Sequence, residues 1–135
     1  SISGQERDTA LFNFLVYAFD WLDTHDDQPN FHLLFLVHLT KFLGFYPDTT
    51  NQGAPFFDLQ EGSFSAKPIQ SPSLQGQTII DFKALLGINF DGLNNVHLTR
   101  TNRQELLSKL VLYFRLHLHG FKEPRSLLVL NAVFG

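Results

Sequence analysis

Six histidines are the side chains of this sequence best suited to bind a metal or transfer a proton. Two histidines on one helix share a metal when they are one turn apart. His32 and His38 are six residues apart and His117 and His119 are two apart, so neither pair shares a helix face. His25 stands beside two aspartates, in a segment that we expect to be a solvated helix end. The spacing therefore favours no metal centre.

Cysteine and the recognised catalytic motifs are also absent from the sequence. There is no cysteine, so a thiol nucleophile, a disulfide and a cysteine zinc site are excluded. No phosphate-binding glycine loop, nucleophile elbow or zinc-protease motif occurs. We therefore expect a protein that is not an enzyme and that needs no cofactor. A metal bound through His25, His97 or His119 would restore the enzyme hypothesis.

One late helix carries residues suited to binding an anion. On its helical wheel Leu112 and Leu116 lie among polar residues, with Arg115 on one side and Lys109 on the other. A leucine pair beside cations suits a ligand with an apolar tip and an acidic body. Alternatively, residues 47–77 or another domain cover these leucines. His117 lies inside the apolar arc, which predicts a hydrogen-bonded histidine at the edge of the core.

Charge is distributed unevenly along the chain. Residues 1–62 hold nine acidic and two basic side chains, whereas residues 95–135 hold six basic and two acidic ones. Arg100 and Arg103 bracket the start of the late helix, where free backbone N–H groups favour a phosphate or carboxylate. The basic half could bind an anionic partner. Alternatively, the two halves attract each other and the arginines are simply solvated.

The elements that position these residues are mainly helices. Apolar residues recur at helical spacing over about 5–24. A second helix is expected over about 28–43, with Pro29 in its first turn and Gly44 as its C-terminal cap. Its apolar residues fall on every side, which is typical of a central, buried helix. Within the polar stretch 47–77, residues 56–65 predict a small hairpin in which Gly62 takes a positive φ.

Two capping-box patterns predict where the later helices begin. Thr78 and Asp81 open a short helix over about 79–86, and Thr101 and Gln104 open the late helix, which runs to about His119. A last helix starts near Pro124. The expected fold is a mainly α, bundle-like single domain over 1–135 with a small β insertion. No apolar run is long enough to cross a membrane.

Several segments, taken in order, resemble the RecO recombination-repair family, in its Bacteroidetes branch. They include ALFNFL at 10–15, WLD at 21–23, NFHL at 30–33, KFLGFYP at 41–47 and FDLQEGSF at 57–64. The most specific are YFRLHL at 113–118, GFK at 120–122, RSL at 125–127 and VL at 129–130. The resemblance implies the family's helical C-terminal domain, without its N-terminal OB-fold barrel. Many members bind zinc through four cysteines in the β insertion, and this chain has none there.

The resemblance also implies a function and partners. The family is non-catalytic, anneals complementary strands, loads the RecA recombinase and acts with RecR in the bacterial cytoplasm, at the nucleoid. Its helical domain docks the acidic, Phe-ended tail of single-stranded-DNA-binding protein. Relatives place arginines on the second helix for this docking, where this chain offers His38 and Lys41.

We therefore expect two sets of binding residues. The tail-binding set is Lys41, Lys109, Leu112, Arg115, Leu116 and His119. The set for single- and double-stranded DNA, which binds mainly through the barrel, is Arg100, Arg103, Lys122 and Arg125. The alternative function is a generic helical interaction or self-association domain.

Overall fold

The computed structural model describes residues 4–118 of the 135-residue chain. This part is mainly helical, as predicted, with a small antiparallel sheet. In chain order its elements are α1 (Gly4–Thr24), α2 (Phe31–Leu43), β1 (Phe56–Asp58), β2 (Ser63–Ser65), β3 (Ser73–Leu74), α3 (Gly76–Leu85), the 3₁₀ helix η1 (Phe90–Asn95) and α4 (Arg100–His117). No helix within residues 4–118 is long and apolar enough to span a membrane.

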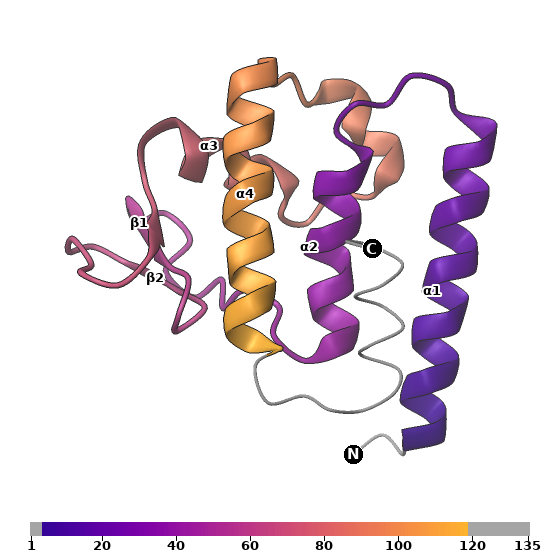
Figure 1. The fold of residues 1–135 in the computed structure, drawn as a ribbon, viewed down its shortest axis with the longest axis horizontal. Coiled ribbons are helices and arrows are strands. Elements are labelled where there is room, and N and C mark those ends of the chain that lie inside the picture. The colour runs from indigo at the N-terminus through magenta and orange to yellow at the C-terminus, as the bar shows by residue number, and fades with distance from the viewer. Residues whose placement is uncertain (1–3, 119–135) are drawn as a thin grey trace.

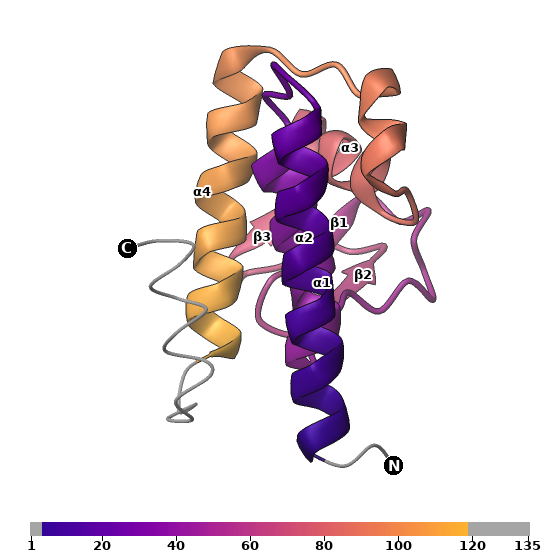
Figure 2. The same ribbon diagram turned by 90° about the vertical axis from the view of Figure 1, so that its right-hand side faces the viewer.

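Helix α2 forms the centre of the domain, between α1 on one side and α4 on the other (Figure 1). Eight of its thirteen residues are buried, which confirms the prediction from its apolar circumference. It ends at Gly44, whose φ of 94° is the predicted left-handed cap. The sheet and α3 lie on the α4 side of this layer, and α1 forms the opposite edge (Figures 1 and 2).

The predicted start of α2 is wrong by about one turn. The helix begins at Phe31, so Pro29 precedes it and does not occupy its first turn. Asn30 is the N-cap residue, but its side chain makes no capping bond. Instead its amide donates to the Val96 carbonyl at 3.1 Å and its oxygen accepts from Arg103 Nε at 3.0 Å. These long-range bonds hold Asn30 outside the helix.

The predicted hairpin is confirmed, and it packs against the helices. β1 pairs with β2 through Phe57 and Phe64, and both rings face Phe82 of α3. Gly62 has the predicted positive φ, 71°. A Cβ there would come within 3.1 Å of the Tyr113 hydroxyl on α4, so a side chain would crowd this hydroxyl as well as strain the backbone.

Two elements of the fold were not predicted from the sequence. β3 pairs with β1 on the side opposite β2, within a segment rich in proline and serine. The 3₁₀ helix η1 begins after Asn89, whose side chain accepts from the Gly92 N–H. The indole N–H of Trp21 on α1 donates to Asp91 at 2.9 Å and thereby ties η1 to α1.

Both predicted capping boxes are wrong. Helix α3 begins at Gly76, and Asp81 is buried within it, bonded to Gln77 at 2.9 Å. Helix α4 is capped by Thr99, whose hydroxyl accepts from the Asn102 N–H at 3.1 Å, so Thr101 lies inside the helix. Helix α4 ends at His117, two residues before its predicted end at His119. Gly120 and the last predicted helix, near Pro124, lie outside the described residues.

The C-terminal part of α4 holds the loop after α2 and the hairpin together. Tyr113 donates its hydroxyl to the Phe45 carbonyl. Burial raises the pKa of Tyr113, so the phenol stays protonated and remains a donor. His117 Nε2–H donates to the Leu59 carbonyl at 2.8 Å, and its ring stacks on Phe45 at 5.2 Å. His117 is therefore the hydrogen-bonded boundary histidine that the wheel predicts.

Candidate functional site

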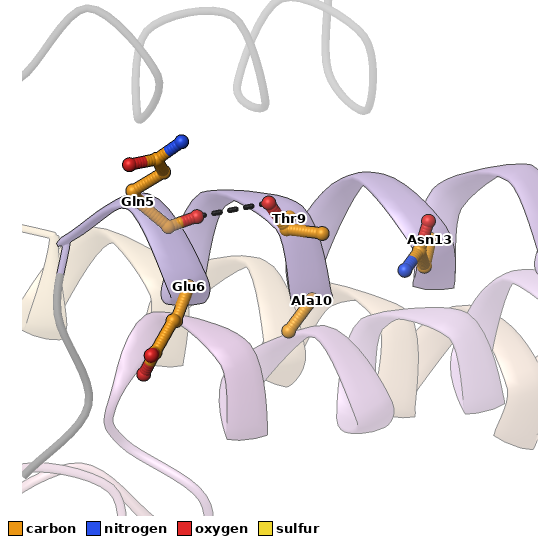
Figure 3. A pocket seen from close by; sticks show the side chains of 5 residues that line it. All are labelled: Gln5, Glu6, Thr9, Ala10 and Asn13. Carbon is orange, nitrogen blue, oxygen red and sulfur yellow. Dashed lines mark hydrogen bonds between the residues drawn. The ribbon is translucent and has the colours of Figure 1, made fainter.

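Two hollows on the surface of α1 differ in chemistry. The larger, about 460 Å³, lies on the first turns of α1 and is lined by Gln5, Glu6, Thr9, Ala10 and Asn13 (Figure 3). The Thr9 hydroxyl donates to the Gln5 carbonyl at 2.9 Å. Among its described lining residues, Glu6 is the one ionisable side chain and it is acidic, so this lining does not favour an anion.

The smaller hollow is an apolar pocket of about 130 Å³ between α1, α2 and the start of η1. Its lining residues are Phe14, Tyr17, His38, Lys41, Phe42, Asn89 and Phe90. We call it the α1–α2 pocket. The ring centroids of Phe14 and Phe42 lie 4.8 Å apart and those of Phe14 and Phe90 6.4 Å apart, so stacked rings form its wall.

The helical repeat explains why these side chains meet. Phe14 and Tyr17 are three residues apart on α1, and His38, Lys41 and Phe42 are three and four apart on α2. Each group therefore occupies one face of its helix.

The third wall of the pocket depends on contacts far apart in sequence. Phe90 is buried, with its ring 5.0 Å from Phe31 and 5.4 Å from Trp21. Together with the Trp21–Asp91 hydrogen bond, these contacts hold η1 against α1.

The ionisable groups of the pocket are a histidine, a lysine and a tyrosine. His38 is half-buried, and its Nε2–H donates to the Ile88 carbonyl at 2.9 Å. Burial lowers the pKa of His38 below its usual 6.5, the Ile88 bond opposes this shift, and the Lys41 ammonium group adds to it. Lys41 is exposed, with its Nζ 4.9 Å from the Tyr46 ring. Among the described residues that line the pocket none is acidic, so its rim favours an anion.

The tail-binding residues predicted on α4 take less exposed positions than the wheel indicates. Leu112 and Leu116 are half-buried and pack against the core, so they do not form a free ridge. Lys109 is half-buried and Arg115 is exposed. The remaining member, His119, lies outside the described residues.

The two predicted DNA-binding arginines within the described residues differ in exposure and in hydrogen bonding. Arg100 is the exposed first residue of α4. Arg103 is half-buried and donates from Nε to Asn30 and from a terminal nitrogen to the Leu98 carbonyl at 3.4 Å. Arg103 therefore joins α4 to the start of α2. Lys122 and Arg125 lie outside the described residues.

Of the pocket residues, the sequence placed Lys41 in the tail-binding set and offered His38 beside it on the second helix. The aromatic residues of the pocket were not singled out for binding, because helical spacing alone does not distinguish a filled interior from a hollow at its edge. The spacing of Phe14 with Tyr17 and of His38 with Phe42 was the available signal.

Comparisons with known proteins identify the family of this chain. Among curated proteins, it is 46% identical to the DNA repair protein RecO of Flavobacterium psychrophilum over 99% of this chain and 56% of that protein. It is 40% identical to the RecO protein of Christiangramia forsetii over 100% of this chain and 56% of that protein, and 41% identical to that of Flavobacterium johnsoniae, over 99% and 56%. The chain thus spans a little over half the length of these relatives.

No solved structure matches the chain. The family described as Recombination protein O C terminal matches residues 1–126, which is nearly the whole sequence. The chain therefore belongs to the Recombination protein O C terminal family.

Proposed function

We propose that this chain is the helical, non-catalytic part of a DNA repair and recombination mediator, and that its α1–α2 pocket binds the tail of single-stranded-DNA-binding protein. The observation that carries this proposal is an apolar pocket with Lys41 at its rim and no acidic residue among its described lining. The family supports the repair role, as do the similar relatives, which are DNA repair proteins RecO. The expected tail is acidic and ends in phenylalanine.

The size of the pocket fits one aromatic ring. A cavity of about 150 Å³ inside a protein is known to bind benzene, and this pocket measures about 130 Å³. Burial of one phenylalanine contributes about 2–3 kcal/mol. An ion pair between the exposed Lys41 ammonium and a carboxylate contributes up to about 1 kcal/mol. Because these two contacts supply less than the about 8 kcal/mol that micromolar affinity requires, we expect weak binding, and salt weakens it further.

The face of α4 supplies a second set of contacts for the acidic residues that precede the terminal phenylalanine. α2 and α4 are neighbours, and their C-terminal ends lie at the same end of the domain (Figures 1 and 2). Lys41 belongs to the last turn of α2, and Arg115 to the last turn of α4. We therefore keep Lys109, Leu112, Arg115, Leu116 and His119 in the proposed tail-binding surface.

We propose that the other roles of the family need more than this chain. With a net charge of −3, this chain by itself is expected to bind DNA poorly. Arg100, Arg103, Lys122 and Arg125 would extend a path that begins on an OB-fold barrel. We assign strand annealing, RecA loading and the contact with RecR to the whole protein, acting in the cytoplasm.

Calorimetric titration of the chain with two peptides tests the pocket. One peptide is acidic and ends in Phe with a free carboxylate, and the other is identical except for a final Ala. We expect the Ala peptide to bind at least about thirtyfold more weakly, because the ring is the part that the pocket buries.

A lysine variant locates the site. Lys41→Ala is expected to weaken binding of the Phe peptide about fivefold, which is the upper range for an exposed charge pair. The matched control, Lys67→Ala, removes an exposed lysine beyond β2 and leaves the affinity unchanged. Equal affinity for both peptides, or no binding of either, overturns the proposal.

A self-association domain is the second candidate, favoured by the acidic first part and basic last part of the sequence. Sedimentation at rising protein concentration distinguishes the two. A monomer at all concentrations rejects this candidate.

A further inference from the structure

His38 has one ring nitrogen committed to the fold and one that can change its proton. Nε2–H donates to the Ile88 carbonyl at 2.9 Å, and a carbonyl oxygen can only accept, so Nε2 keeps its hydrogen. Nδ1 is therefore the nitrogen that titrates. Within residues 4–118 no side chain or backbone group bonds to it. The ring lines the α1–α2 pocket, three residues before Lys41 on the same helix.

We propose that His38 is a specificity-determining residue of the α1–α2 pocket, which takes up a proton when a carboxylate binds and so favours anionic over neutral ligands. This inference rests on the proposed function of the pocket. The proton comes from solvent and is held at Nδ1. No covalent bond is made or broken besides the N–H bond.

The charges around His38 explain why the proton arrives only with the ligand. On its own helix Lys41 is positive, on α1 the lining groups are Phe14 and the neutral Tyr17 phenol, and on the η1 side they are Asn89 and Phe90. The nearest acid of η1, Asp91, is bonded to Trp21. The empty pocket thus has burial and a cation, which both oppose an imidazolium ion, and no carboxylate among its described lining residues.

A bound carboxylate reverses the electrostatic balance. An opposite charge about 4–6 Å from a titrating group shifts its pKa by about one to three units toward the charged form. The pKa of His38 must then be higher in the complex than in the free protein. Affinity for the anion must therefore increase as the pH falls, by at most about tenfold for each unit of the rise, a limit that is reached below both pKa values.

The test is calorimetric titration of the whole chain with the acidic, Phe-ended peptide, whose N-terminus is acetylated. The titration is repeated between pH 8 and pH 5.5, where the peptide carboxylates stay ionised. For the unchanged protein we expect the affinity to rise by at least about threefold toward pH 5.5. His38→Gln keeps an N–H donor for Ile88 but cannot gain a proton, so its affinity should change by about twofold or less. His32→Gln, at an exposed position of α2, is the matched control and should behave like the unchanged protein.

A second measurement does not depend on a variant. The pKa of His38, followed by NMR in the free and peptide-bound protein, should rise on binding. Binding with equal pH dependence in the unchanged protein and His38→Gln, or an unshifted His38 pKa, overturns the inference and leaves the proposed function standing. Absence of binding at every pH overturns both.

Discussion

The α1–α2 pocket and the leucine pair of α4, Leu112 and Leu116, contain the same kinds of residue, apolar side chains beside a cation, but they differ in shape. At the pocket, η1 closes a third wall around Phe14 and leaves a hollow that fits one ring. On α4, Leu112 and Leu116 are half-buried and pack against the core. A helical wheel predicts the direction of a side chain, whereas a hollow at the surface needs a third element from elsewhere in the chain.

The largest expected effect is on the wall of the pocket. Phe90→Ala removes a fully buried ring and is expected to lower the free energy of unfolding by about 3–5 kcal/mol. Leu116→Ala in the leucine pair of α4 should lower the free energy of unfolding clearly less, because Leu116 is only half-buried. Urea unfolding of both variants measures the difference. Equal losses would show that the two regions are packed alike.

Gly62→Ala tests how tightly the β1–β2 hairpin packs against α4. The new Cβ would require a strained positive φ and would crowd the Tyr113 hydroxyl, so we expect a loss of about 1–2 kcal/mol. Gly53→Ala is the control, because nothing lies within 4 Å of its Cβ position. Thermal unfolding followed by circular dichroism compares the two. An unchanged Gly62→Ala protein would contradict the tight packing of β1–β2 on α4.

Two substitutions on α4 sharpen the comparison for binding. Arg115→Ala and Lys109→Ala should each weaken the acidic peptide about twofold, less than Lys41→Ala, because no hollow holds the peptide there. The measurement is the same calorimetric titration. Larger effects than that of Lys41→Ala would move the main site to α4, and unchanged affinity in both variants would remove α4 from it.

The smallest effect is the pH dependence of stability. Because the pKa of His38 is lowered in the folded state, the unfolded chain binds this proton more readily, and stability falls as the pH drops through about 6.5. His38→Gln should therefore lose less stability than the unchanged protein between pH 7.5 and 5.5. Urea unfolding at the two pH values checks this. An equal loss would mean that other groups account for the whole dependence.

Sequence patterns predicted the elements whose cause is local. The apolar circumference of α2, the Gly44 cap and the positive φ of Gly62 each follow from neighbouring residues, and the structure confirms them. The starts of α3 and α4 were wrong because a threonine followed three residues later by an acid or amide also occurs inside helices. At α4 the true cap, Thr99, lies only two residues before the predicted one.

The elements that were missed depend on distant partners. η1 is held by the bond from Trp21 to Asp91, seventy residues along the chain. β3 forms on the second edge of β1, where Leu74 pairs with Phe57. Since η1 completes the α1–α2 pocket, the sequence alone could name Lys41 but could not place it beside a hollow.

The position of Trp21 gives this protein a built-in optical reporter. It is the only tryptophan in the sequence, so the tryptophan emission of the chain arises from one place. Its indole is 8% exposed, stacks on His25 at 4.0 Å and lies 5.4 Å from Phe90, the inner wall of the α1–α2 pocket. Intrinsic fluorescence can therefore follow both ligand occupancy and loss of the α1–η1 contact, without any added label.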